Sequence, residues 1–189
     1  MMCEVELGGV RLLTMFALRF GLSEIETLAE LYVAANSDQE AEDAIETVIS
    51  PRVRARGCYK KDEFLELCRW KTPRSKKHCA SNADAFVDEA TAVALGASDE
   101  RLRIGALTLL KGVSFPTASV LLHFGSADPY PILDFRALEA LGAAEPSWYS
   151  FEFWWDYVVF CRGLADQAGV SMRTLDRAMW QWSKNLMKP

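Results

Sequence analysis

The stretch that decides the predicted fold is Leu109-Leu110-Lys111-Gly112-Val113-Ser114-Phe115-Pro116-Thr117-Ala118. An apolar helical pattern ends at Gly112, a residue type that commonly follows the last turn of a helix. Pro116 suits the first turn of a second helix, where its missing N–H is harmless. Two helices are therefore predicted to meet at a tight turn, whose free amides and helix dipole would favour a phosphate. An ordinary helix connection with Gly112 as the C-cap is the alternative interpretation.

Helix signals extend over the rest of the chain, and strand signals are nearly absent. The last helix carries an apolar stripe at i, i+3, i+4, i+7 spacing, formed by Leu175, Ala178, Met179 and Trp182. Further helices are predicted to begin at serines that precede such patterns. These serines are Ser23, Ser37, Ser81, Ser98 and Ser171. The patterns together predict an all-α fold without a β-sheet.

The composition is that of a globular protein, since 50% of the 189 residues are hydrophobic and 25% are charged. This length suits one domain over residues 1–189, or two small lobes that share a core. No apolar run approaches the roughly 18 residues of a membrane-spanning helix. Glu4 and Glu6 stand where a signal peptide would carry positive charge. A cytoplasmic location is therefore expected.

The net charge of −5 hides an uneven distribution along the chain. Residues 1–50 carry two basic and ten acidic side chains, whereas residues 51–77 carry ten basic and three acidic ones. With Tyr59 and Trp70 interleaved, this basic segment could neutralise phosphates while an aromatic ring stacks on a base. A solvated face beside an acidic neighbour is the alternative. The ten cations are Arg52, Arg54, Arg56, Lys60, Lys61, Arg69, Lys71, Arg74, Lys76 and Lys77.

A second stretch lies downstream of the turn and reads Tyr130-Pro131-Ile132-Leu133-Asp134-Phe135-Arg136. Together the two stretches resemble the helix-hairpin-helix base-excision DNA glycosylases, the HhH-GPD family. That family has the pattern Leu-x-Gly-(Val or Ile)-Gly-x-x-x-Ala, then a Pro-rich loop and an essential aspartate. The matching residues are Leu110, Gly112, Val113, Ala118, Pro131 and Asp134. The resemblance implies a compact bundle of two small lobes with an interlobe cleft, a hairpin motif at about 99–124 and a catalytic loop at about 128–136.

The activity implied by the resemblance is hydrolysis of the N-glycosidic bond of a damaged or modified base flipped from double-stranded DNA. Asp134 would stabilise the positive charge that develops on the sugar, or orient the attacking water. It is also a natural N-cap for a helix that begins near Phe135. Strand-cleaving members of the family carry a lysine nucleophile where this chain has Pro116, so the resemblance implies a monofunctional enzyme.

Other functions stay open because Ser114 departs from the family pattern. The family has a second glycine there, which lets the backbone approach a phosphate. A non-catalytic helix-hairpin-helix module that binds DNA is therefore the alternative. A helical interaction protein without nucleic acid is a third hypothesis, since the first fifty residues are acidic.

The resemblance also suggests which other residues would lie near DNA. Contacts are expected from Lys111, Gly112, Val113, Ser114, Thr117, Arg136, Arg69 and Lys71. A base pocket or a duplex wedge is expected from Trp70, His123, Trp148 and Tyr149. Trp70 and His123 could equally be core side chains, and Trp148 and Tyr149 could merely cap the aromatic helix that follows.

The resemblance further implies a structural Na⁺ or K⁺ on the carbonyls of Thr108, Leu110 and Gly112. No other cofactor is expected. An iron–sulfur cluster is not expected, because only Cys161 lies in the C-terminal half of the chain. The five cysteines lack any Cys-x-x-Cys pair and predict neither a disulfide framework nor a common zinc site. Double-stranded DNA is the expected partner, with no membrane or obligate protein partner evident, so the protein would join the nucleoid when bound to DNA.

Overall fold

The computed structural model describes residues 3–7 and 10–186, and almost all of its regular structure is helical. The all-α fold predicted from the sequence is confirmed. The chain divides into two compact units. Residues 1–37 and 131–189 form the discontinuous unit, and residues 38–130 form the central unit.

The exception to the helical structure is a short β-hairpin at the start of the chain. Strand β1 (Cys3–Leu7) pairs antiparallel with β2 (Val10–Thr14), with Cys3 opposite Thr14 and Leu7 opposite Val10. The prediction of no sheet is therefore wrong for this segment. The sequence contains a signal for it, because apolar and acidic residues alternate up to Leu7 and two glycines separate the runs.

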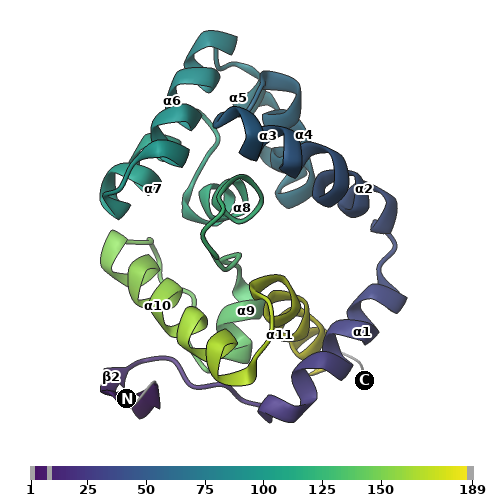
Figure 1. Ribbon diagram of the computed structural model, residues 1–189, viewed down its shortest axis with the longest axis vertical. Helices are drawn as coiled ribbons and strands as arrows, with labels where there is room; N and C mark the ends of the chain where they lie inside the picture. The colour runs from purple at the N-terminus through teal and green to yellow at the C-terminus, as the bar shows by residue number, and fades with distance from the viewer. Residues whose placement is uncertain (1–2, 8–9, 187–189) are drawn as a thin grey trace. The chain divides into compact units, whose positions relative to one another are not determined.

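The discontinuous unit is built around its last helix. Its helices are η1 (Leu22–Glu24), α1 (Ile25–Ala35), α9 (Phe135–Ala140), α10 (Phe151–Ala168) and α11 (Met172–Leu186). Helix α11 packs against α1, α9 and α10 (Figure 1). Leu175, Ala178 and Met179 of the predicted stripe are fully buried, whereas Trp182 is half-buried and stacks on Phe20 at 5.8 Å.

The central unit surrounds one buried helix. Its elements are α2 (Gln39–Ala44), η2 (Ile45–Ile49), α3 (Ser50–Arg56), α4 (Lys61–Lys71), η3 (Pro73–Ser75), α5 (Lys76–Ala80), α6 (Asp84–Gly96), α7 (Glu100–Thr108) and α8 (Phe115–Gly125). Helix α8 contacts α3, α4, α6 and α7, and every residue from Thr117 to Gly125 is buried. A helix that is apolar on all sides belongs in a core, and α8 is that helix here.

The predicted helix starts fall within three residues of the observed ones, but the caps often differ. Ser171 caps α11 as predicted, since its Oγ accepts a hydrogen bond from the Thr174 amide at 3.0 Å. At the start of α7 the cap is Asp99 rather than Ser98. Near Ser23 the Gly21 amide donates to the Glu24 carboxylate at 2.7 Å, so a serine capping box does not form there. Neighbouring short polar residues can each accept from the free amides of a first turn, and the backbone conformation determines which of them becomes the N-cap.

Candidate functional site

The six residues from Leu109 to Ser114 join α7 to α8 and form the turn expected from the sequence. Ser114 is the N-cap of α8, and its side chain makes no capping hydrogen bond. Pro116 lies in the first turn of α8, as its fixed φ and missing N–H predict. The positive end of the α8 dipole therefore lies at an exposed serine.

Gly112 is required by the shape of this turn. Its φ of +82° lies in the left-handed region, which favours glycine. A Cβ here would lie 2.8 Å from Cys79 Sγ and 2.9 Å from both Cys79 N and His78 Cβ. The turn is thus pressed against α5, and a larger residue does not fit.

Ser114 does not need to be a glycine. Its φ of −108° and ψ of 176° are extended values that any residue adopts. The departure from the family pattern therefore causes no backbone strain in this turn. An exposed hydroxyl replaces a hydrogen atom at the helix start.

The turn residues expected to contact DNA divide by burial. Lys111 and Ser114 are exposed, and Gly112 is half-exposed. Val113 and Thr117 have exposed fractions of 8% and 2%, because their side chains face the core around α8. A DNA contact by Val113 or Thr117 would therefore have to use main-chain atoms.

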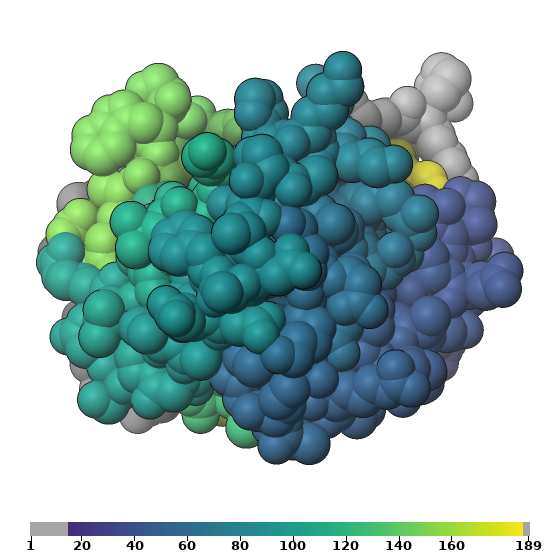
Figure 2. Space-filling model, turned by 90° about the horizontal axis from the view of Figure 1, so that it is seen from above, coloured from purple at the N-terminus to yellow at the C-terminus, as the bar shows by residue number. Residues whose placement is uncertain are grey.

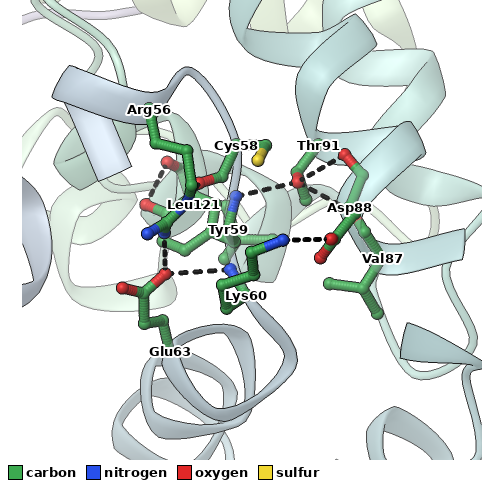
Figure 3. Close-up of polar contacts among 9 residues, drawn as sticks. All are labelled: Arg56, Cys58, Tyr59, Lys60, Glu63, Val87, Asp88, Thr91 and Leu121. Carbon is green, nitrogen blue, oxygen red and sulfur yellow. Dashed lines mark hydrogen bonds and ion pairs between the residues drawn. The ribbon is translucent and has the colours of Figure 1, made fainter. Parts of the chain in front are cut away.

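Several cations of the basic segment are already neutralised within the central unit. Arg56 pairs with Glu63, Lys60 with Asp88, and Arg69 with Glu66 (Figure 3 shows the first two pairs). Lys61 pairs with Asp84 at 3.5 Å and also donates to the Asn82 carbonyl, and Arg54 donates to the His123 carbonyl at 3.4 Å. These side chains already have partners within the unit. For these five cations, the alternative interpretation of the basic segment, a solvated face beside acidic neighbours, therefore fits better than phosphate binding.

The remaining cations include a group beside the turn. Arg74, Lys76 and Lys77 are exposed, and no acidic partner for them is found within the described residues. They lie on η3 and α5, and α5 is the helix whose His78 and Cys79 touch Gly112. Figure 2 looks onto the face of this unit formed by α3 to α6, from which long side chains project. We call Arg74, Lys76, Lys77 and Lys111 the turn patch.

Arg69 and Lys71 lie in the last turn of α4 and precede Arg74, the first residue of the turn patch, in the sequence. Arg69 is exposed but paired with Glu66, and Lys71 is half-buried. Trp70 between them is half-buried and meets the ring of Phe124 edge-to-face at 5.7 Å. An aromatic contact with α8 favours the core interpretation of Trp70.

His123 is a core residue of the central unit. It is 9% exposed, its Nδ1–H donates to the Tyr130 carbonyl at 2.6 Å, and its ring meets Phe124 at 4.8 Å. Burial and this hydrogen bond favour the core interpretation of His123 over the base-pocket interpretation. His123 is buried because it lies on α8, which the other helices of the central unit surround.

Asp134 is the N-cap of α9 in the discontinuous unit. The side chain is half-buried, and its Oδ1 accepts a hydrogen bond from the Ala137 amide at 2.8 Å. The N-cap role foreseen from the sequence is therefore present. The carboxylate oxygens lie at the positive end of the helix dipole, where a negative charge is favoured.

The loop before Asp134 is tied down by two residues that the sequence did not single out. The Tyr157 hydroxyl donates to the Ile132 carbonyl at 2.8 Å, and the Ile132 amide donates to Asp176 Oδ1 at 3.1 Å. Both side chains are buried. Because α10 and α11 each hold the same residue of the loop, the position of Asp134 is set by packing as well as by its cap.

Two phenols lie within electrostatic reach of Asp134. Burial raises the pKa of Tyr149, and its hydrogen bond to Glu145 and the charges of Glu145 and Asp134 raise it further. Burial likewise raises the pKa of Tyr157, with Cys161, Asp176 and Asp134 adding to the effect. Tyr149 is half-buried and Trp148 beside it is 73% exposed. Tyr149 therefore lies within electrostatic range of Asp134.

Arg136 is held by aromatic rings rather than extended into solvent. Its guanidinium lies 5.0 Å from the ring centres of both Phe135 and Trp180, and Nη1 donates to Ser183 Oγ at 3.3 Å. Such contacts suit a structural cation.

The described residues contain no cluster of three or more His, Cys, Asp or Glu side chains that could hold a metal ion. Within the same residues, no helix combines the length and the apolar character needed to span a membrane. Comparison of the chain with family models, with curated proteins and with solved structures gave no match.

Proposed function

We propose that this protein binds double-stranded DNA through the turn patch and hydrolyses the N-glycosidic bond of a flipped base, as a monofunctional glycosylase of the helix-hairpin-helix type. The observation that carries the proposal is the contact of α5 with the turn at Gly112. It places the segment that carries Arg74, Lys76 and Lys77 against the turn whose sequence resembles the hairpin of that family.

The turn patch has the chemistry of a phosphate site. Lys111 and three cations from η3 and α5 supply positive charge, and the uncapped start of α8 supplies main-chain donors behind it. The exposed Ser114 hydroxyl adds one donor. Contacts of this kind fix the register of a duplex without reading its sequence.

A monovalent cation also suits this turn, through the carbonyls of Thr108, Leu110 and Gly112. Leu110 O accepts from the Val113 amide and Gly112 O faces the Cys79 thiol at 3.7 Å, and each keeps a second lone pair. When bound, the cation would add positive charge next to a phosphate.

Asp134 would supply the charge stabilisation for bond cleavage. As the bond between C1′ and the base nitrogen breaks, its electrons leave with the base and positive charge develops on the sugar. A fixed carboxylate lowers the energy of that state, and water then adds at C1′ and loses a proton. No step uses a Schiff base, because Pro116 provides no amine.

The first test concerns DNA binding. We expect Lys76→Ala/Lys77→Ala to weaken duplex binding by at least about tenfold and to reduce the slope of log K against log salt by roughly 2, because two phosphate contacts are lost. Fluorescence anisotropy with an undamaged duplex, titrated at several salt concentrations, measures both quantities.

The matched control is Lys60→Ala/Arg69→Ala, which removes two cations of the same segment that are paired with Asp88 and Glu66. We expect this variant to keep most of the affinity and slope. An equal loss in both double variants would mean that general charge, and not the turn patch, attracts DNA.

The second test concerns catalysis by Asp134→Asn. We expect the variant to bind duplexes normally but to release base at least about a hundredfold more slowly, because an amide cannot stabilise the sugar cation. The substrates are duplexes that each carry one deaminated, alkylated, oxidised or enzymatically methylated base. Alkaline cleavage at the abasic product measures release.

Asp99→Asn is the control for capping. Asp99 caps α7 in the same way, with its Oδ1 accepting from the Leu102 amide at 2.9 Å. Asparagine is a good N-cap, so neither substitution should unfold the protein. Base release that is equal in wild type and Asp134→Asn would remove the aspartate from the chemistry.

A non-catalytic DNA-binding module is the second candidate. The hydrogen bond from Ala137 to Asp134 favours it, because capping alone accounts for an aspartate at that position. Patch-dependent DNA binding without base release from any of the duplexes would identify this function.

A further inference from the structure

Asn82, between α5 and α6, makes a two-point contact with the turn. Its Oδ1 accepts from the Lys111 amide at 2.8 Å, and its Nδ2 donates to the Lys111 carbonyl at 3.0 Å. Nδ2 also donates to the Cys79 carbonyl at 2.9 Å. The side chain is 5% exposed, so these bonds are shielded from water.

This contact holds the backbone of Lys111, one of the four residues of the turn patch. With both its N–H and its C=O held, the backbone of Lys111 has little freedom, and Gly112 follows at a φ of +82°. The Lys111 side chain stays exposed. A cation on a backbone fixed in this way loses less entropy when it binds a phosphate.

Asn82 is itself supported from α4. Lys61 donates its ammonium to the Asn82 carbonyl, and the Lys61 side chain is only 17% exposed. Lys61 therefore belongs to the support of the turn rather than to the cations that face solvent.

We propose that Asn82 is a positioning residue that presets the Lys111–Gly112 turn for phosphate binding. This inference rests on the proposed DNA-binding function and deepens it. A side-chain amide offers an acceptor and a donor side by side, which matches the N–H and C=O of a single residue.

The test is Asn82→Ala, read out by duplex affinity and by hydrogen exchange of the Lys111 amide. We expect affinity to fall roughly tenfold and the Lys111 amide to lose protection, because the turn must order itself when DNA binds. In the Lys111→Ala background the same substitution should cost less affinity, because part of what Asn82 positions is already absent.

Thr91→Val is the matched control for stability. Thr91 is fully buried, and its Oγ1 accepts from the Tyr59 amide at 2.9 Å and donates to the Val87 carbonyl at 2.7 Å, so the substitution removes comparable hydrogen bonds within the same unit. Urea unfolding gives the stability of each variant. A structural role alone would lower stability in both variants and leave the affinity of folded protein unchanged.

Folded Asn82→Ala that binds DNA like wild type would overturn the inference. Unchanged protection of the Lys111 amide would also overturn it. If wild type binds no duplex DNA, the proposed function fails and phosphate positioning fails with it, while hydrogen exchange still decides whether Asn82 holds the turn.

Discussion

At the scale of single residues, Gly112 and Gly57 show two different reasons for a glycine. Both have positive φ, +82° and +78°. A Cβ on Gly57 would meet no atom within 4 Å, whereas one on Gly112 would press on Cys79 and His78. Gly57 therefore serves only backbone conformation, and Gly112 serves both conformation and the close approach of α5.

The contrast predicts unequal costs for two identical substitutions. Gly57→Ala should lower the free energy of unfolding by about 1 to 2 kcal/mol, the cost of a left-handed non-glycine residue. Gly112→Ala should cost about 2 to 5 kcal/mol, because crowding against the Cys79 backbone is added. Urea unfolding measures both values, and equal costs would contradict the steric contact.

At the scale of elements, Tyr59 links the loop after α3 to two helices (Figure 3). Its amide donates to Thr91 Oγ1 of α6 at 2.9 Å, and its hydroxyl donates to the Leu121 carbonyl of α8 at 2.8 Å. The side chain is fully buried, and a Cβ on Gly125 would lie 2.8 Å from its ring. Tyr59 thus holds the loop between α3 and α4 against α8.

Tyr59→Phe removes the hydroxyl and keeps the ring. We expect a loss of about 1 to 2 kcal/mol in the free energy of unfolding, because a buried hydrogen bond to a carbonyl is lost. Tyr149→Phe is the control, since its hydroxyl donates to the exposed Glu145 at 3.1 Å. That change should stay within about 0.5 kcal/mol. Thermal unfolding followed by circular dichroism compares the two, and equal losses would contradict the role of Tyr59.

At the scale of the whole molecule, each unit contains a fully buried phenol whose pKa is raised. Tyr59 lies in the central unit and Tyr157 in the discontinuous unit. Burial, as the largest cause, raises the pKa of both well above 10. The folded state therefore keeps its protons at a pH where the unfolded chain loses them.

This difference predicts a loss of stability in alkali. The contribution of both phenols is complete below the unfolded pKa of about 10 and declines as pH rises above it, because only the unfolded chain ionises. Absorbance of phenolate at 295 nm should show that some of the five tyrosines fail to ionise at pH 10.5 until the protein unfolds. The Tyr59→Phe/Tyr157→Phe variant should show a weaker pH dependence. Free titration of all five in folded protein would contradict the prediction.

The candidate site was predictable only in part, and the limits follow from the range of the interactions. Asp134 could be recognised as an N-cap because its partner, Ala137, is three residues away. Thr117 and His123 could not be assigned to the core, because the mostly apolar sequence of α8 has no periodicity that reveals which face is solvated. Their burial depends on the helices that surround α8.

The sequence by itself determined the helices, the turn at Gly112 and the cap at Asp134, because each depends on periodicity or on backbone preferences over a few residues. Only the tertiary structure decided which cations are neutralised and which stay exposed. It also decided that Asn82, 29 residues before Lys111, holds the turn. Pairing between side chains that are distant along the chain depends on how the helices pack, and the local sequence does not indicate which of these side chains meet.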